Sequence, residues 1–190
     1  MGRMIKPQDA VVLMVDMQEK LVPGIWQKDQ LLRRCRLLLR GLALMEQPVL
    51  VTHQYTKGLG ETEACLRQEL TQYAPMEKIT FSCWADETIA QAIRDSGRHT
   101  VVLCGIEAHI CVEQTALELL DAGYRVVLLA DCVGARRQED CQVALERMRQ
   151  AGAEVTTCEA FLFELMGRAG TEQFKQFSRI IKEADWEEQA

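Results

Sequence analysis

The sequence predicts an α/β protein with a three-layer α/β/α, Rossmann-like fold and a six-stranded, mostly parallel sheet. Short apolar runs alternate with longer segments in which apolar residues recur every three or four positions. The apolar runs are continuous rather than alternating, which is typical of strands that are buried on both faces of a sheet. This β–α repetition favours a parallel sheet with helices on both faces. Because no linker, low-complexity tract or longer repeat interrupts it, we expect one domain over residues 1–190.

Six short segments are the predicted strands. The run Ala10 to Val15 is the strongest and is followed by an acid, whereas the segment that begins at Lys78 is weak. Strands are expected at residues 10–15, 48–52, 78–82, 100–104, 125–130 and 154–157.

The segments between these strands have helical periodicity. Asp86 is a plausible N-cap, and Gly97, Gly123 and Gly152 follow helical segments at positions where a left-handed residue commonly ends a helix. The last segment places Phe174, Phe177 and Ile181 on one face; we expect core packing there, with an assembly surface as the alternative. Helices are expected at residues 31–42, 63–72, 86–95, 111–122, 138–151, 160–166 and 171–184, and a loop at 54–62.

Composition excludes several classes of partner and site. The formal net charge of −6 argues against nucleic-acid binding, and no apolar run reaches the ~18 residues that suggest a membrane span. The N-terminus lacks the features of a signal peptide, so we expect a cytoplasmic protein. The eight cysteines form no C-x-x-C pair, and Cys35, Cys104 and Cys158 fall inside apolar elements. We therefore expect buried thiols rather than disulfides or a zinc cluster.

A nucleotide cofactor is not expected. The turn after the first strand has no glycine before Gly24, so neither glycine-rich phosphate-binding motif is present. Asp16 would also place a negative charge where a phosphate would bind.

Three reactive residues fall near the ends of predicted strands, where parallel sheets gather their functional groups. Cys111 is expected to open a helix, where backbone N–H groups stabilise a thiolate and can hold an oxyanion. Asp16 follows the first strand and Lys78 begins the third. Each has an ordinary alternative role. Cys111 could be a buried structural cysteine, Asp16 could be an N-cap, and Lys78 could be a surface lysine. Together they form a coherent set of nucleophile, general base and cationic partner.

The ordered motifs resemble those of the isochorismatase-like cysteine hydrolases along nearly the whole chain. The matching blocks are Val15-Asp16-Met17-Gln18, Glu77-Lys78 through Ser82, Val102 through Val112 with Thr115 and Ala116, and Ala122-Gly123-Tyr124 with Ala130-Asp131.

This resemblance implies a catalytic triad of Cys111, Asp16 and Lys78. It also implies a cis peptide between Ile106 and Glu107, and an oxyanion hole made by the backbone amides of Glu107 and Cys111. The implied activity is hydrolysis of a small amide or a related C–N substrate through a thioester. A homo-oligomer is also implied, with a small-molecule substrate as the ligand.

The sequence departs from the nicotinamidases of this superfamily, which carry an Asp-x-His…His metal site after the second strand. The corresponding segment has His53 but no aspartate, so no metal is expected. Candidate substrate contacts are Gln18, Gln54, Tyr55, Trp84 and His109, with a structural role for His109 as an alternative. Asp131 is expected to organise the loop 132–138.

Two other functions stay open at this point. One is cleavage of a vinyl ether, as by an isochorismatase proper, which in some members does not need the cysteine. The other is a catalytically idle oligomeric module that only binds partners. Alkylation of Cys111 well below pH ~8.5 would distinguish an activated thiol from an idle one.

Overall fold

The computed structural model describes residues 4–189, with side chains for residues 4–184. Its six strands form one sheet in the order β3-β2-β1-β4-β5-β6, and every neighbouring pair is parallel. The predicted fold class is therefore confirmed, with an all-parallel sheet. The strands are β1 (Ala10–Val15), β2 (Val49–Gln54), β3 (Met76–Lys78), β4 (Thr100–Ile106), β5 (Arg125–Gly134) and β6 (Glu154–Thr156).

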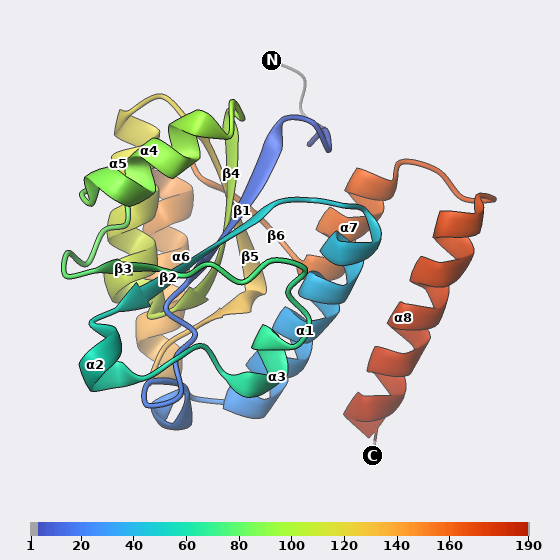
Figure 1. Cartoon of the computed structure of the whole chain (residues 1–190), viewed down its shortest axis with the longest axis horizontal. Helices are drawn as coiled ribbons and strands as arrows, with labels where there is room; N and C mark the ends of the chain where they lie inside the picture. The colour runs from blue at the N-terminus through green and yellow to red at the C-terminus, as the bar shows by residue number, and fades with distance from the viewer. Residues whose placement is uncertain (1–3, 190) are drawn as a thin grey trace.

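Helices cover both faces of the sheet (Figure 1). Alternate residues of β1 point to opposite faces, so Val12 and Met14 enter one core while Val11 and Leu13 enter the other. The first core includes buried residues of α1 (Lys28–Leu44), α7 (Cys158–Met166) and α8 (Glu172–Gln189). The second includes residues of α4 (Glu87–Asp95), α5 (Glu113–Asp121) and α6 (Gln138–Gln150). Shorter helical segments are η1 (Val22–Gly24), α2 (Thr56–Leu59), α3 (Ala64–Arg67) and η2 (Ala108–Val112).

The strand order places a switch point between β1 and β4. From β1 the chain builds the sheet outward to β3, then returns to add β4 on the other side of β1. Such a point opens a crevice beyond the carboxyl ends of the two central strands. The residues that follow β1 and β4 therefore face the same space.

The third strand was predicted in the wrong place. The segment 78–82 was expected to be a strand that Lys78 begins, but Lys78 ends β3. Its partner strand β2 stops at Gln54, which pairs with Lys78, so the residues beyond have no strand to pair with. Thr80 instead donates a hydrogen bond to the Ser82 carbonyl at 2.8 Å, and Ile79 is 69% exposed. The shift places Lys78 at the carboxyl edge of the sheet.

Other sequence expectations differ in length rather than in kind. The predicted helix 63–72 shrinks to α3, and the predicted loop 54–62 contains the single turn α2. Asp86 caps α4 as expected, accepting hydrogen bonds from the amides of Thr88 and Ile89. Phe177 of α8 is fully buried against the first core, which confirms the core-packing account of that face. Among the described residues, no helix combines the length and apolarity needed to cross a membrane.

The eight cysteines are free thiols. Cys35, Cys104 and Cys158 are fully buried in the first core, as their apolar surroundings predicted.

Gly105 permits the close approach of β1 and β4 at the switch point. It pairs with Val15, has φ +114°, and an added Cβ would lie 2.1 Å from the Val15 carbonyl oxygen. No side chain fits there, because both the backbone angle and the space exclude a Cβ.

We expect Gly105→Ala to destabilise the protein by at least ~3 kcal/mol, because the β1–β4 pair must separate or the backbone must change conformation. The matched control is Gly123→Ala, where φ is also positive (+86°) but nothing lies within 4 Å of the added carbon. That control should cost only about 1 kcal/mol. Urea denaturation measures both, and equal losses would contradict the packing account.

Candidate active site

Asp16 and Lys78 form a dry ion pair at the carboxyl edge of the sheet. Asp16 follows β1, Lys78 ends β3, and the side chains meet across the end of β2. Lys78 Nζ lies 2.6 Å from Asp16 Oδ2, and the two side chains are 0% and 1% exposed. A lysine in this setting is stable only with close acceptors.

Hydrogen bonds complete the surroundings of both charges. The Lys78 ammonium also donates to Gln54 Oε1 at 2.7 Å and to the Thr80 carbonyl at 3.3 Å, so its three donors are all used. Asp16 Oδ1 accepts a hydrogen bond from Thr52 Oγ1 at 2.7 Å. Lys78 therefore has no free N–H group to offer a ligand, and it influences its neighbours through its positive charge.

The charge on Lys78 is maintained by its neighbours. Burial works against the ammonium, but Asp16, Cys83 and Cys111 outweigh it, so the pKa of Lys78 is raised above its ordinary value. Lys78 therefore keeps its charge at neutral pH.

Cys111 approaches the Asp16–Lys78 pair from the segment after β4, on the other side of the switch point. It was expected to open the helix after the fourth strand, but it lies inside η2, a π-helical turn that precedes α5. Its position is fixed by Thr115, whose hydroxyl donates to the Cys111 carbonyl at 2.6 Å and accepts from the Cys83 amide at 2.8 Å. Cys111 is 8% exposed, which makes it the accessible member of the three. We call Cys111, Asp16 and Lys78 the thiol–acid–lysine cluster.

The resting Cys111 is a thiol and not the thiolate that a helix start would favour. Burial raises the pKa of Cys111 to about 12; the charge of Asp16 and a hydrogen bond to it act in the same direction, and Lys78 opposes them. The cluster thus holds the Cys111 proton beside a carboxylate that can accept it.

The turn before Cys111 contains the cis peptide bond between Ile106 and Glu107, where the resemblance implied it. The Glu107 carbonyl accepts hydrogen bonds from the amides of Ile110 and Val112 at 3.0 and 3.2 Å, which closes the turn. The Glu107 carboxylate is held by Arg136, through Nε at 2.9 Å and the backbone amide at 3.2 Å. The side chain of Glu107 is therefore held by Arg136.

Two of the predicted substrate contacts hold the site together instead. Gln18 is fully buried, and its amide donates to the carbonyls of Gln54 and Gly60 and accepts from the Gln54 backbone amide. Gln54 accepts from Lys78 and donates to the Ile79 carbonyl at 2.8 Å. Both side-chain amides are thus committed within the protein, so we assign them to positioning rather than to substrate contact.

Trp84 and His109 also point elsewhere. The Trp84 ring packs edge-on against Tyr124 at 5.2 Å, and Tyr124 lies before β5, at the amino edge of the sheet. His109 Nε2 lies 3.9 Å from Asp140 Oδ2 in the first turn of α6, while its Nδ1 is buried without a partner among the described residues. The Trp84 ring is thus packed on Tyr124, its contact with substrate stays a prediction, and for His109 we favour the structural alternative.

Tyr55 remains a candidate contact. It follows β2 in a left-handed conformation (φ +39°), is 48% exposed, and its amide donates to the Lys78 carbonyl at 3.1 Å. Its half-exposed ring lies against Gly58, so its contact with substrate stays a prediction.

Asp131 has a role different from the predicted one. It does not organise a loop at 132–138, because Cys132 to Gly134 continue β5. Its Oδ1 accepts a hydrogen bond from the Cys158 amide at 2.7 Å and so fixes the start of α7.

Sequence reasoning missed Thr52 and Cys83. Thr52 ends the apolar run of β2, and its hydroxyl contacts Asp16 Oδ1 and lies 3.8 Å from the Cys83 sulfur. The register of β1 and β2 contained the signal: Met14 pairs with Val51, which places Thr52 beside the end of β1. No comparable pattern marks Cys83.

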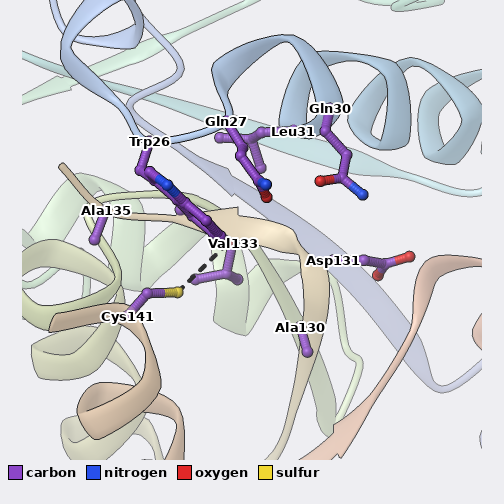
Figure 2. A pocket seen from close by; sticks show the side chains of 10 residues that line it. Trp26, Gln27, Gln30, Leu31, Ala130, Asp131, Val133, Ala135 and Cys141 are labelled. Atoms are coloured by element: carbon purple, nitrogen blue, oxygen red, sulfur yellow. Dashed lines mark hydrogen bonds between the residues drawn. The ribbon is translucent and has the colours of Figure 1, made fainter. Parts of the chain in front are cut away.

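A cavity of about 150 Å³ lies between the start of α1 and the end of β5 (Figure 2). Figure 2 shows the Cys141 thiol pointing to Val133 on the same side of the view as Trp26, with Gln30 and Asp131 on the opposite side. None of its lining residues belongs to the thiol–acid–lysine cluster, so we do not assign it to the chemistry of Cys111. Within residues 4–184, no group of three or more His, Cys, Asp or Glu side chains is arranged to hold a metal ion.

Comparison with known proteins identifies the family. Residues 10–160 match the model of the isochorismatase domain. The chain belongs to the isochorismatase family. It is 38% identical over 185 residues to isochorismatase domain-containing protein 2 of Macaca fascicularis, covering 96% of this chain and 87% of that protein. Membership in this family supports a hydrolase role.

Solved structures agree with this assignment. The MAR1 ribonuclease from Caenorhabditis elegans superposes with a TM-score of 0.86 at 33% identity, covering 94% of this chain and 92% of that one. The YcaC gene product of Escherichia coli, described as an octameric hydrolase of unknown specificity, has a TM-score of 0.86 at 20% identity and covers 97% and 98%. At that identity, YcaC shows the shared fold alone.

Removing one charge of the buried pair should be costly. We expect Lys78→Met to lower the free energy of unfolding by about 3–5 kcal/mol, because Asp16 is then left ionised in a dry site. The double variant Lys78→Met with Asp16→Asn should recover a large part of that loss, since no unpaired charge remains. Urea denaturation tests both; a single variant as stable as the wild type would show that the pair is not buried as described.

Proposed function

We propose that the protein is a cysteine-dependent hydrolase that cleaves a small amide or a related C–N bond through a thioester. The observation that carries the proposal is the position of the Cys111 thiol beside a carboxylate that Lys78 and Thr52 hold in place. An acidic acceptor next to a protonated nucleophile is the arrangement that general-base activation needs. Catalytic roles for Cys111, Asp16 and Lys78 follow.

Acylation begins when Asp16 accepts the Cys111 proton as the sulfur attacks the carbonyl carbon. The C–S bond forms, and the carbonyl electron pair moves to oxygen, where the backbone amides of Glu107 and Cys111 stabilise the oxyanion. When the intermediate collapses, the C–N bond breaks and Asp16 gives its proton to the leaving nitrogen. A thioester on Cys111 and a free amine or ammonia result.

Deacylation follows the same steps with water as the nucleophile. Asp16 accepts a proton from the water as its oxygen attacks the thioester carbon, and the C–S bond then breaks. The acid leaves, and Asp16 returns the proton to Cys111. Lys78 balances the Asp16 carboxylate in the resting enzyme and takes no proton in either half.

The surroundings of Cys111 favour a small substrate. Cys111 is 8% exposed, so only a compact group can reach its sulfur. A cavity of about 310 Å³ is lined in part by Glu107, whose backbone amide belongs to the proposed oxyanion hole. The cavity is lined by Lys20, Leu21, Gly24, Ile25, Glu107 and Arg136.

Cleavage of RNA has less support, although the Caenorhabditis elegans relative is named a ribonuclease. The chain carries a net charge of −6, and Lys78 is buried and bound to Asp16 rather than available to a phosphate. We also propose a homo-oligomer, as described for the octameric YcaC. A cytoplasmic location stays a prediction of the sequence.

Loss of the nucleophile should abolish turnover. We expect Cys111→Ala and Asp16→Asn each to lower kcat/KM at least ~1,000-fold on any small amide that the wild type hydrolyses. The control is Cys141→Ala, which removes another partly buried thiol outside the cluster and should leave turnover unchanged. A screen of primary and secondary amides, read by release of ammonia or amine, supplies the assay. Full activity of Cys111→Ala would refute the proposal.

The reactivity of Cys111 towards iodoacetamide should depend on Asp16. With its pKa at about 12, very little of Cys111 is ionised at pH 8, so the wild type should react slowly and faster as the pH rises. Asp16→Asn removes the charge and hydrogen bond that raise this pKa and leaves Lys78, which lowers it. We therefore expect alkylation of Cys111 at pH 8 to accelerate at least ~10-fold in that variant.

Peptide mapping by mass spectrometry follows Cys111 separately from the other thiols. Asp131→Asn is the matched control, because this carboxylate contacts the start of α7 instead of Cys111. Slower alkylation in Asp16→Asn than in the wild type would contradict the account in which the charge of Asp16 raises the pKa of Cys111.

A further inference from the structure

We propose that Thr52 is a positioning residue for this hydrolysis, because its hydroxyl fixes the Asp16 carboxylate in the orientation that accepts the Cys111 proton. The inference rests on the proposed function and adds a fourth side chain to its machinery. Thr52 is fully buried near the end of β2, the strand that lies between those bearing Asp16 and Lys78.

Thr52 contacts Asp16 at two points. The Thr52 hydroxyl donates to Asp16 Oδ1 at 2.7 Å, and the Asp16 backbone amide donates to the Thr52 carbonyl at 3.3 Å. Asp16 has φ +50°, so the chain leaves the strand conformation at this residue. The backbone contact therefore fixes the position of the Asp16 main chain, and the hydroxyl contact fixes the orientation of its carboxylate.

The two oxygens of Asp16 have different partners. Lys78 donates to Oδ2 at 2.6 Å, and Thr52 donates to Oδ1. With one donor on each oxygen, the carboxylate cannot rotate about its terminal bond without breaking a short hydrogen bond. Lys78 alone would hold only one oxygen, and the carboxylate could then turn away from Cys111.

Cys83 is the second contact of the Thr52 hydroxyl. An ionised carboxylate can only accept, so the single hydroxyl proton of Thr52 goes to Asp16. The Cys83 sulfur lies 3.8 Å from the Thr52 oxygen, and its thiol can donate to the lone pair that remains. Burial raises the pKa of Cys83 to about 11, so this thiol keeps its proton at neutral pH. The result is a chain of donors from Cys83 through Thr52 to Asp16.

The hydroxyl also stabilises the charged form of Asp16, which is the form that accepts a proton. Without it, the carboxylate holds a proton more readily, and a larger share of the enzyme is inactive at low pH. Loss of the hydroxyl should therefore move the acidic limb of the pH–rate profile to higher pH. A threonine that only filled space would leave that limb unchanged.

The test compares Thr52→Val, Thr52→Ser and the wild type with a small amide whose hydrolysis requires Cys111. We expect Thr52→Val, which keeps the shape but loses the hydroxyl, to lower kcat at least ~10-fold with little change in KM. Its acidic limb should move upward by at least about half a pH unit. Thr52→Ser keeps the hydroxyl and should stay within ~3-fold of the wild type with an unshifted profile.

Thr100→Val is the matched control. Thr100 is also a fully buried strand threonine whose hydroxyl donates to an aspartate, Asp9, at 2.9 Å, but it lies at the amino edge of the sheet. Its loss should affect stability without changing the pH–rate profile. If Thr52→Val does not fold, Thr52→Ala and Thr52→Ser are compared, because they differ by the hydroxyl alone.

The outcomes separate this inference from the proposed function. If Cys111→Ala and Asp16→Asn are inactive while Thr52→Val keeps the wild-type kcat and profile, Thr52 has no positioning role and the proposed function stands. If Thr52→Ser loses as much activity as Thr52→Val, the methyl group matters rather than the hydroxyl, and the inference is overturned. If Cys111→Ala keeps full activity, the proposed function itself fails.

Discussion

The buried pair of Asp16 and Lys78 is the interaction on which the rest of the site depends. Two charges in a dry environment are stable only when every donor and acceptor has a partner. Three adjacent strands supply these partners: β1 brings Asp16, β2 brings Thr52 and Gln54, and β3 brings Lys78. The parallel order of β3, β2 and β1 therefore places an ionised carboxylate at the switch point, and Gln18 ties the loops around it together.

This carboxylate determines the state of the thiol across the crevice. Because Cys111 is buried beside a negative charge, its pKa rises to about 12 and it keeps its proton while no substrate is bound. Cysteine hydrolases that rely on a preformed thiolate use a neighbouring cation or helix dipole to lower the pKa of the thiol. Here the cation is committed to the acid. In the proposed mechanism the proton therefore leaves Cys111 during the attack itself, so turnover would depend on how well Asp16 is oriented rather than on a standing thiolate.

The sequence was sufficient for the fold, because continuous apolar runs are local signals, and the resemblance to the isochorismatase-like hydrolases gave the place of the cis peptide. It misplaced the third strand, since the end of β3 depends on where its partner β2 stops. It also did not foresee that the Gln18 and Gln54 amides bond within the protein, because a sequence shows that polar residues follow strands but not which way they turn. Thr52 was missed for the same reason: its role depends on the register of β1 and β2.

The most direct test of the central claim, a thioester on Cys111, is a partition experiment with hydroxylamine. Two amides that share an acyl group but release different amines are hydrolysed in the presence of a fixed concentration of hydroxylamine, and the hydroxamate and free acid are quantified. If both substrates pass through one acyl-enzyme, the ratio of hydroxamate to acid is the same for the two amides, and an acyl adduct maps to the peptide that contains Cys111. A ratio that changes with the leaving amine, with no adduct on that peptide, would contradict a covalent intermediate on this cysteine.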